Sequence, residues 1–438
     1  MTRFSAYASI FTYHTAMNIL VIGSGGREHA LVWKLSQSRH VSQIICAPGN
    51  AGIEQRAACR AVDVAHVDQL VALAEAERID LTVVGPEAPL VSGVVDAFGQ
   101  RGLKILGPTQ AAAQLEGSKV FAKEFMARHG IPTASFTVCD SAPAARNAIQ
   151  SGRFGFPLVV KADGLAAGKG VTVAQTREQA ELAIEQAMVE KVFGAAGERV
   201  VIEACLFGRE CSFLLFTDGE TIAPMPAAQD YKRALDGDPG PNTGGMGSIS
   251  VPGLVDERIW THILDTIARP TVQAMNSEGT PYRGILYIGL MLTQDGPQVL
   301  EYNVRLGDPE TQAVLPRLES DLVEISEAIT AGELSGIELR WNQNAVACVV
   351  VASGGYPGSY LKGFPIEGLD EVAPMPDVFV FHAGTVRSSD ERILTAGGRV
   401  LGVTAWDRTL SEALDRAYQA VSRLHFENVH YRRDIGKT

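Results

Sequence analysis

After residue 17 the chain begins with short apolar segments that alternate with stretches of helical periodicity. Residues 18–22, 43–47 and 81–84 are apolar runs of strand length, and each ends in a glycine or proline turn. Between the second and third runs, residues 66–77 place apolar side chains at helical spacing. Strands that alternate with helices usually form parallel sheets, so this pattern predicts an open parallel α/β sheet.

The middle of the chain has a different pattern, in which β-branched and aromatic runs predict hairpins. Residues 157–161 and 171–174 form the first, joined by the glycine-rich loop 162–170. Residues 285–292 and 299–304 form the second, with a glycine–proline turn between them.

The C-terminal part mixes strand and helix patterns. Strand-like runs at 345–352, 378–382 and 399–404 precede a helical stripe of apolar residues that starts at Leu410. This combination predicts a small α+β unit, and its sequence contains no cluster of catalytic residue types.

Composition narrows the class of protein. The 438 residues exceed the size of about 250 to 300 residues at which single cores stop growing, so several domains are expected. The 38 basic and 50 acidic residues give a net charge of -12, which argues against a general nucleic-acid surface. No run approaches the roughly 18 apolar residues of a membrane span, and no C-x-x-C pair suggests a zinc ribbon or disulfide framework. A cytoplasmic protein fits these features.

The strongest sign of chemistry is the strand at 299–304. Side chains two apart share a face of a strand, so Glu301 and Asn303 point the same way. Their oxygens suit a hard cation such as Mg²⁺, which takes oxygen ligands from protein, water and phosphates. An isolated pair of this kind is better explained as the solvent face of a strand. Charged residues crowd the turn that follows and favour a binding site: Arg305, Asp308 and Glu310.

The glycine-rich loop 162–170 is the second sign. Glycine permits close backbone approach, and Lys161 and Lys169 supply charge, so the loop is suited to folding over phosphates. It is not a P-loop, because it is one residue too short between Gly164 and Gly168 and a strand follows it. The alternative is an ordinary long hairpin with solvated lysines.

The glycine turn at 23–28 matches a dinucleotide-binding turn only in part. Glu28 occupies the third glycine position, and no acidic residue closes the second strand to hold a ribose. NAD is therefore disfavoured, whereas a phosphate-bearing small molecule is compatible with the helix after the turn.

Two further segments are candidates for ligand contacts. Residues 204–208 connect the predicted strands 199–203 and 209–216, and their backbone groups could meet an adenine edge while Glu210 accepts from ribose hydroxyls. The polar, glycine-rich excursion between 229 and 247 is long enough to be a binding loop. Taken alone, the carboxylates Glu203 and Glu210 would be assigned to the surface.

Together, several motifs in this order resemble the phosphoribosylamine-glycine ligase family of the ATP-grasp superfamily. They are GSGGREHA (23–30), APGNAG (47–52), VGPEAPL (84–90), QLEGSK (114–119), KADGLAAGKG (161–170), PNTGGMG (241–247) and RLGDPE (305–310). The resemblance runs from Met17 to about Gly436. Residues 1–16 lie outside the family pattern, and Leu306 stands where many relatives have phenylalanine.

The resemblance implies an α/β and α+β multidomain fold: an N-terminal open parallel α/β sheet, a central two-part ATP-grasp fold and a small C-terminal α+β domain. We expect five parts in the chain. They are a leader at 1–16, either disordered or the result of an early start codon, a substrate-binding domain at 17–118, a small subdomain with the glycine flap at 119–190, a large subdomain with the metal strand at 191–336, and the C-terminal domain at 337–438.

The activity implied by the resemblance is an ATP-dependent ligation in de novo purine biosynthesis. ATP would phosphorylate the carboxylate of glycine, and the amine of 5-phosphoribosylamine would attack the glycyl phosphate to give glycinamide ribonucleotide, ADP and phosphate. The implied cofactors are ATP and Mg²⁺, with Mn²⁺ as a substitute. We expect a cytoplasmic monomer that binds these small molecules and neither nucleic acid nor a membrane.

The resemblance also carries residue roles. Glu301 and Asn303 would hold the metal. Residues for ATP would be Lys119, Lys161, Gly168, Lys169, Glu203, Ala204, Leu206 and Glu210. Residues for glycine and phosphoribosylamine would be Gly25, Gly26, Asn50, Glu87, Asp230, Arg305 and Asp308. Lys161, Asp230 and Arg305 are the expected catalytic residues.

Two alternatives remain at the level of sequence. One is an ATP-grasp ligase for another acid or amine, such as a carboxylase. The other is a nucleotide-sensing relative that lost turnover, although such a protein would have little reason to keep Glu301, Asn303, Asp230 and Arg305 together.

Overall fold

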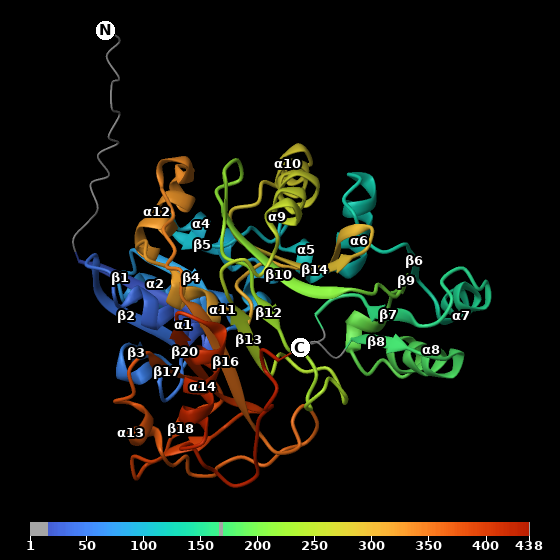
Figure 1. Ribbon diagram of the computed structural model, residues 1–438. Helices are drawn as coiled ribbons and strands as arrows, with labels where there is room; N and C mark the ends of the chain where they lie inside the picture. Colours follow the sequence, from blue (N-terminus) through green and yellow to red (C-terminus); the bar gives the residue numbers. More distant parts are fainter. Residues whose placement is uncertain (1–15, 166–169, 438) are drawn as a thin grey trace.

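The N-terminal part of the molecule is an open parallel sheet (Figure 1). The computed structural model describes residues 16–165 and 170–437, so nearly all of the expected leader lies outside the described residues. The strand order is β3-β2-β1-β4-β5 with parallel neighbours, which confirms the predicted sheet. Its elements are β1 (Met17–Gly23), α1 (Gly26–Leu35), β2 (Val41–Pro48), β3 (Ala58–Cys59), α2 (Val67–Ala76), β4 (Leu81–Val84), α3 (Glu87–Val91), α4 (Val94–Gln100) and β5 (Ile105–Leu106).

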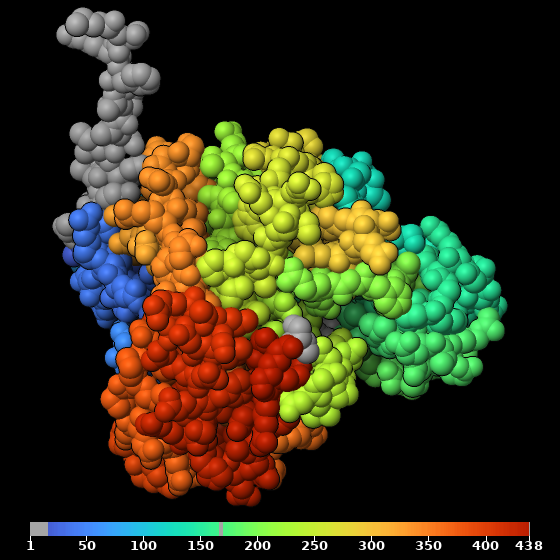
Figure 2. Space-filling model, viewed as in Figure 1, coloured from blue at the N-terminus to red at the C-terminus, as the bar shows by residue number. Residues whose placement is uncertain are grey.

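A small lobe projects from the body of the molecule (Figure 2). Its antiparallel sheet has the order β6-β9-β7-β8, and β7 pairs with β8 as the predicted hairpin, with Lys161 opposite Val171. The predicted ATP-binding residues Gly168 and Lys169 belong to the segment 166–169, which lies outside the described residues. The elements of the lobe are β6 (Phe136–Cys139), α7 (Ala142–Gln150), β7 (Leu158–Ala162), β8 (Val171–Ala174), α8 (Arg177–Ile184) and β9 (Val200–Ala204).

A second antiparallel sheet, the large sheet, has the order β11-β10-β14-β15. Strands β14 and β15 form the predicted hairpin, in which Gly289 lies opposite Glu301 and Tyr287 opposite Asn303. The consecutive strands β9 and β10 belong to different sheets, so residues 205–208 cross from the small lobe to the body. The elements here are β10 (Arg209–Thr217), β11 (Ile222–Pro224), α9 (Glu257–Ile263), α10 (Arg269–Ser277), β14 (Gly284–Thr293) and β15 (Gly296–Asn303).

The C-terminal sheet includes two short strands from the predicted binding loop. Its order is β12-β13-β16-β20-β17, with β21 paired to β16, so the 229–247 excursion is anchored to the C-terminal part. The predicted small α+β unit is confirmed. The C-terminal sheet is made of β12 (Gln229–Asp230), β13 (Gly247–Ser250), β16 (Ala345–Ser353), β17 (Val378–His382), β20 (Arg399–Asp407) and β21 (Val429–His430). Strands β18 (Thr385–Arg387) and β19 (Ile393–Thr395) form a separate two-stranded sheet, and the helices of this part are α13 (Leu369–Val372) and α14 (Leu410–Val421).

Four helices lie between these units: α5 (Gln114–Gly117), α6 (Lys119–Arg128), α11 (Glu310–Val314) and α12 (Leu322–Ala331). Ser118 ends α5 and caps α6, because its side chain accepts from the backbone N–H of Phe121. This junction places Glu116 and Lys119 on either side of the cap. Strand β9 belongs to the small sheet although it lies beyond residue 190, and the five-part division of the chain stays a prediction.

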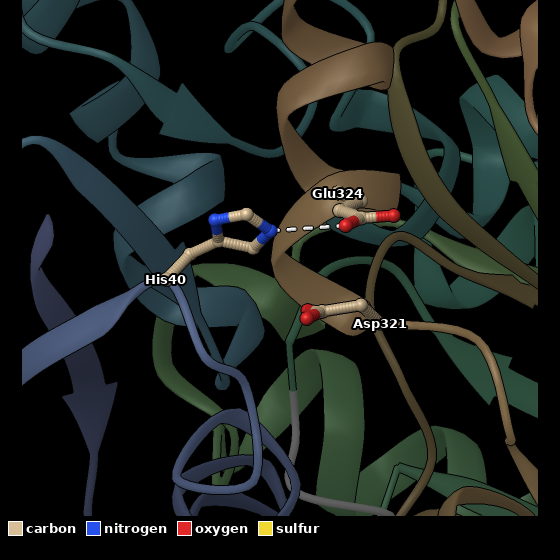
Figure 3. A group of neighbouring side chains, drawn as sticks. All are labelled: His40, Asp321 and Glu324. Atoms are coloured by element: carbon tan, nitrogen blue, oxygen red, sulfur yellow. Dashed lines mark hydrogen bonds and ion pairs between the residues drawn. The ribbon is translucent and has the colours of Figure 1, made fainter. Parts of the chain in front are cut away.

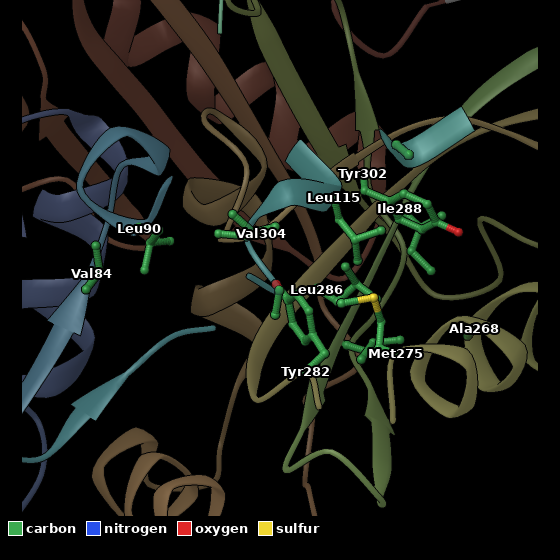
Figure 4. Packing of buried hydrophobic residues seen from close by; sticks show 14 of the residues in the cluster. Val84, Leu90, Leu115, Ala268, Met275, Tyr282, Leu286, Ile288, Tyr302 and Val304 are labelled. Atoms are coloured by element: carbon green, nitrogen blue, oxygen red, sulfur yellow. The ribbon is translucent and has the colours of Figure 1, made fainter. Parts of the chain in front are cut away.

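One apolar cluster joins the parallel sheet to the large sheet (Figure 4). It contains Val84 of β4 and Leu90 of the neighbouring helix α3, together with Leu286 of β14 and Val304, which directly follows β15. Each fully buried aliphatic side chain contributes about 1.5 to 3 kcal/mol. Because Val304 precedes Arg305, the shared core holds the turn after β15 against the carboxyl edge of the parallel sheet.

The described part of the chain contains no helix that is both long and apolar enough to cross a membrane.

Candidate nucleotide and substrate site

A cleft of about 1170 Å³ lies between the small lobe, the large sheet and the loops around β12. Most of the predicted site residues line it, and they come from the N-terminal domain, the small lobe, the large sheet and the loops that join them. They are Glu87, Lys119, Lys161, Glu203, Ala204, Leu206, Glu210, Asp230, Glu301, Asn303, Arg305 and Asp308. The alternation of side chains along β15 therefore places Glu301 and Asn303 in one cleft, as predicted.

The glycine hairpin and the metal strand are in direct contact. The Nζ atom of Lys161 on β7 donates to the backbone oxygen of Leu300 on β15, at 3.0 Å. Lys119 donates from α6 to the backbone oxygen of Gly164 at the base of the flap, at 2.8 Å. Two lysines therefore lie where the flap meets the strand that carries Glu301.

Glu301 lies in a strongly positive setting. Burial alone would raise its pKa, but the charges of Lys232, Lys161 and Lys119 outweigh burial and lower it. The carboxylate therefore stays ionised, which is the form that binds a metal.

Lys161 also belongs to a buried charge cluster that the sequence did not reveal. Glu203 on β9 forms ion pairs with both Lys123 and Lys161, and the three side chains are almost fully buried. Burial lowers the pKa of Lys123 to about 8. Two lysines therefore engage the carboxylate of Glu203, and the predicted contact of Glu203 with adenine stays a prediction.

Arg305 is clamped by two carboxylates. Its Nε atom donates to Glu87 at 3.1 Å, and its Nη2 atom donates to Glu116 at 2.6 Å. Glu116 also accepts from the backbone N–H of Val304, at 2.7 Å. These bonds fix the plane of the guanidinium, which has five N–H groups in total and so keeps donors for a ligand.

Glu116 should make stability depend on pH. Burial raises its pKa to about 7 from an ordinary 4.5, against the opposing charge of Arg305. The folded state holds this proton to a higher pH than the unfolded state, so the stabilisation is complete below about pH 4.5 and is lost as the pH rises to about 7. We expect the free energy of unfolding of the wild type, relative to Glu116→Gln, to fall by roughly 2 to 3 kcal/mol between pH 5 and pH 7.5.

Urea unfolding of both proteins at several pH values measures this difference. A difference that stays constant with pH would show that Glu116 is ionised throughout this range.

Asp230 on β12 offers an acceptor to a small cation. Burial, followed by the charge of Glu310, raises its pKa. Its Oδ1 atom is buried and has no hydrogen-bond partner in the part of the chain that the structure describes. Gly245, at φ +108°, passes so close that an added Cβ would lie 2.6 Å from this oxygen. Only a glycine leaves the carboxylate in this position.

Lys232 lies between two predicted ligand residues. Its Nζ atom is 3.3 Å from Glu210 and 3.7 Å from Glu301. The charge of Glu210, followed by the opposing effect of burial and by the charge of Glu301, raises the pKa of Lys232, so the amine stays protonated.

The predicted phosphoribosylamine residues divide into two groups. Glu87 lies in the cleft, whereas Gly25, Gly26 and Asn50 are not among its lining residues. Asn50 uses its amide to donate to Ser24 and His382 and to accept from Gly52 and Ile53, so it shapes the loop after β2. The roles of these three residues in binding stay predictions.

Asp308 connects the cleft to the C-terminal sheet. Its carboxylate accepts from Gln312 at 2.8 Å and pairs with Arg399 at 3.4 Å. Burial alone would raise the pKa of Asp308, but Arg399 and Arg27 lower it. The C-terminal domain therefore contributes a charged residue to the cleft, which its sequence alone did not suggest.

Sequence reasoning missed four residues of the site: Glu116, Lys123, Lys232 and Arg399. Glu116 and Lys232 lie within segments that the sequence singled out, but each side chain could equally have faced solvent. Lys123 lies four residues after Lys119, which places both on one face of α6 and is a usable signal.

A separate group of acidic and histidine side chains lies at the junction of the α1–β2 loop and α12 (Figure 3). His40 is 2.9 Å from Glu324, while Asp321 caps α12 through the N–H of Val323 and accepts from Ser38. The positive end of a helix dipole disfavours a cation here. We therefore interpret this group as a contact that fixes α12 to the N-terminal sheet.

Comparison with known families accounts for this arrangement. Three family models match: phosphoribosylglycinamide synthetase N domain at residues 17–116, ATP-grasp (A) domain at 117–311 and C domain at 346–438. A phosphoribosylamine–glycine ligase from Xylella fastidiosa is 51% identical over 423 residues, which is 96% of this chain and 97% of the relative. One from Caldanaerobacter subterraneus is 47% identical over 419 residues, 96% and 99% of the two chains.

Solved structures agree with this result. The phosphoribosylamine–glycine ligase of Thermotoga maritima has a TM-score of 0.83 and 33% identity, and the match covers 95% of this chain and 99% of that one. A biotin carboxylase domain from Hydrogenobacter thermophilus has a TM-score of 0.71 at 16% identity, covering 95% and 91%, which shows a shared fold alone. The resemblance seen in the motifs is confirmed: the chain belongs to the phosphoribosylglycinamide synthetase family.

Proposed function

We propose that this chain joins glycine to 5-phosphoribosylamine, consuming ATP and releasing ADP and phosphate, as a step of de novo purine biosynthesis. The contact between Lys161 and the backbone of Leu300 carries this proposal, because it joins the phosphate-binding hairpin to the strand of Glu301. A triphosphate in the cleft would meet the lysines and the carboxylate at the same point.

The donor set fits a divalent cation. Glu301 and Asn303 present a carboxylate and an amide oxygen in one cleft, and both are hard ligands of the kind that Mg²⁺ and Mn²⁺ accept. When bound, the ion would neutralise phosphate charge and orient the terminal phosphate. We propose Mg²⁺ as the usual ion.

The nucleotide would lie along the cleft from the connector to β15. The backbone at Ala204 and Leu206 is suited to the adenine edge and Glu210 to the ribose, while Lys119 and Lys161 would neutralise the phosphates. Phosphoryl transfer needs positioning and charge stabilisation more than a protein nucleophile, which agrees with this set of side chains.

Glycine would lie between Asp230 and Arg305. The buried acceptor of Asp230 suits the ammonium group, and the remaining N–H groups of Arg305 suit the carboxylate. Gly245 leaves no room for a larger residue beside Asp230. Glu87, which orients Arg305, faces the same part of the cleft and is our candidate for contact with phosphoribosylamine.

The reaction then has two steps. A carboxylate oxygen of glycine attacks the terminal phosphorus of ATP, ADP leaves, and a glycyl phosphate forms. The amine of phosphoribosylamine attacks the carbonyl carbon, loses a proton, and expels phosphate to leave the amide. Arg305 holds the carboxylate in line in the first step, and Lys161 offsets the negative charge that develops on the phosphoryl oxygens.

An assay that omits one component at a time tests this proposal. We expect steady ADP formation only when ATP, glycine and phosphoribosylamine are all present. ADP formation that continues without glycine, or that needs another acid such as bicarbonate, would assign the chain to a different ligation. ATP binding without any turnover would support a sensor.

We also propose a cytoplasmic monomer without nucleic-acid or membrane partners, which the net charge of -12 supports. A dimer observed by sedimentation velocity would contradict the proposed monomeric state.

A further inference from the structure

Lys232 lies between the ribose end and the metal end of the proposed ATP site. Its Nζ atom is 3.3 Å from an oxygen of Glu210 and 3.7 Å from an oxygen of Glu301. Charge-assisted hydrogen bonds of this kind are usually about 2.7 to 2.9 Å long, so the ammonium group is held loosely by both carboxylates.

The backbone of Lys232 is fixed although its side chain is not. Its carbonyl oxygen accepts from the N–H of Thr243 at 2.7 Å and from the hydroxyl of Thr243 at 2.8 Å. The side chain is 29% exposed. The residue therefore keeps its place in the loop while its ammonium group can move within the cleft.

The other lysines near Glu301 are engaged elsewhere. Lys119 donates to Gly164, and Lys161 donates to Leu300 and pairs with Glu203. Within residues 16–165 and 170–437, Lys232 is the lysine whose ammonium group is in ion-pair range of Glu301.

A divalent cation and Lys232 would be close neighbours at Glu301. Two positive groups a few ångströms apart in a partly buried site repel each other unless anions lie between them. The triphosphate of ATP would supply such anions. It would lie between Glu210 and Glu301, which is where the ammonium group of Lys232 lies.

We propose that Lys232 couples metal binding to nucleotide binding. Its ammonium group competes with the divalent cation for Glu301, and the phosphates of ATP draw it away, so that the cation and the nucleotide enter together. In the complex Lys232 contacts phosphate oxygens. This inference rests on the proposed function, because it assumes that Glu301 holds the metal and that ATP occupies the cleft.

Mn²⁺ alone is a direct probe of the competition. We expect Lys232→Met to bind Mn²⁺, in the absence of nucleotide, about tenfold more tightly than the wild type, as measured by the loss of the EPR signal of free Mn²⁺. Lys232→Arg should keep the weak binding of the wild type, because it keeps the charge. The control Lys104→Met removes a lysine from an exposed pair with Glu327 and should change nothing.

A double variant shows where the added Mn²⁺ binds. The double variant Lys232→Met with Glu301→Gln should not bind Mn²⁺ more tightly than the wild type, because the carboxylate for which Lys232 and the ion compete is gone. Lys232 does not compete for Glu301 if Lys232→Met binds Mn²⁺ no more tightly than the wild type. The same conclusion follows if the double variant binds Mn²⁺ as tightly as Lys232→Met.

Nucleotide binding tests the proposed contact between Lys232 and the phosphate oxygens of ATP. With Mg²⁺ present, Lys232→Met should bind a non-hydrolysable ATP analogue about tenfold more weakly than the wild type, in calorimetry. Unchanged affinity would overturn the contact with phosphate. If the wild type shows the three-substrate ligase activity and these shifts are missing, the inference about Lys232 fails alone; a wild type without that activity contradicts the proposed function instead.

Discussion

Replacement of Glu301 by alanine is expected to lower the rate of ADP formation by about a thousandfold or more while the protein stays folded. The side chain provides the carboxylate that faces Lys161, Lys119 and Lys232 in the cleft. Without it, the charge on the terminal phosphate would be less neutralised and the phosphate less well oriented. The coupled assay with all three substrates measures the rate, and circular dichroism with thermal unfolding measures the fold.

Asp295 provides the matched control. It lies in the turn of the same hairpin, is exposed, and its replacement by alanine should leave the rate unchanged. If Glu301→Ala keeps more than about a tenth of the wild-type rate, the carboxylate is not a metal ligand that the reaction requires.

Replacement of Arg305 by methionine is expected to lower the free energy of unfolding by about 3 kcal/mol or more. Glu87 and Glu116 would both lose their ion pair with Arg305, and the side chain of Glu116 is almost fully buried. Glycine-dependent ADP formation should also disappear, because the guanidinium group that is proposed to bind the carboxylate of glycine is gone. Urea unfolding at pH 8 measures the stability, since Glu116 is ionised there in the wild type.

A second substitution separates the two effects of Arg305. The pair Arg305→Met with Glu116→Gln removes one unpaired carboxylate, so part of the lost stability should return while activity stays absent. The exposed pair of Arg128 and Glu278 offers a comparison, and Arg128→Met should cost less than about 1 kcal/mol. If Arg305→Met and Arg128→Met lower the free energy of unfolding equally, the buried ion pairs of Arg305 do not stabilise the fold more than an exposed pair does.

Much of the framework followed from local pattern. Apolar runs that end in glycine turns predicted the parallel sheet, and side-chain alternation placed Glu301 beside Asn303. These features depend on residues close in sequence, whose periodicity fixes the direction of each side chain. The same reasoning identified the glycine hairpin, although two of its predicted ligands, Gly168 and Lys169, lie outside the described residues.

Contacts between distant elements could not be predicted in this way. Lys123 and Lys161 meet Glu203 only because β7 lies beside β9 and α6 packs near their ends. Glu116 reaches Arg305 because a shared core joins the parallel sheet to the large sheet. The anchoring of the 229–247 excursion to the C-terminal sheet likewise depends on pairing between β13 and β16, which are far apart in the sequence, and no local signal encodes it.

Isotope transfer from glycine tests the central claim most directly, namely that ATP phosphorylates a glycine carboxylate held between the glycine hairpin and the strand of Glu301. Glycine labelled with ¹⁸O in its carboxylate is turned over with ATP and phosphoribosylamine, and the released phosphate is analysed by mass spectrometry. Attack of the carboxylate on the terminal phosphorus predicts that each phosphate carries one labelled oxygen and that the other label stays in the amide. Phosphate without label would show that no glycyl phosphate forms, and the proposed use of the cleft would be wrong.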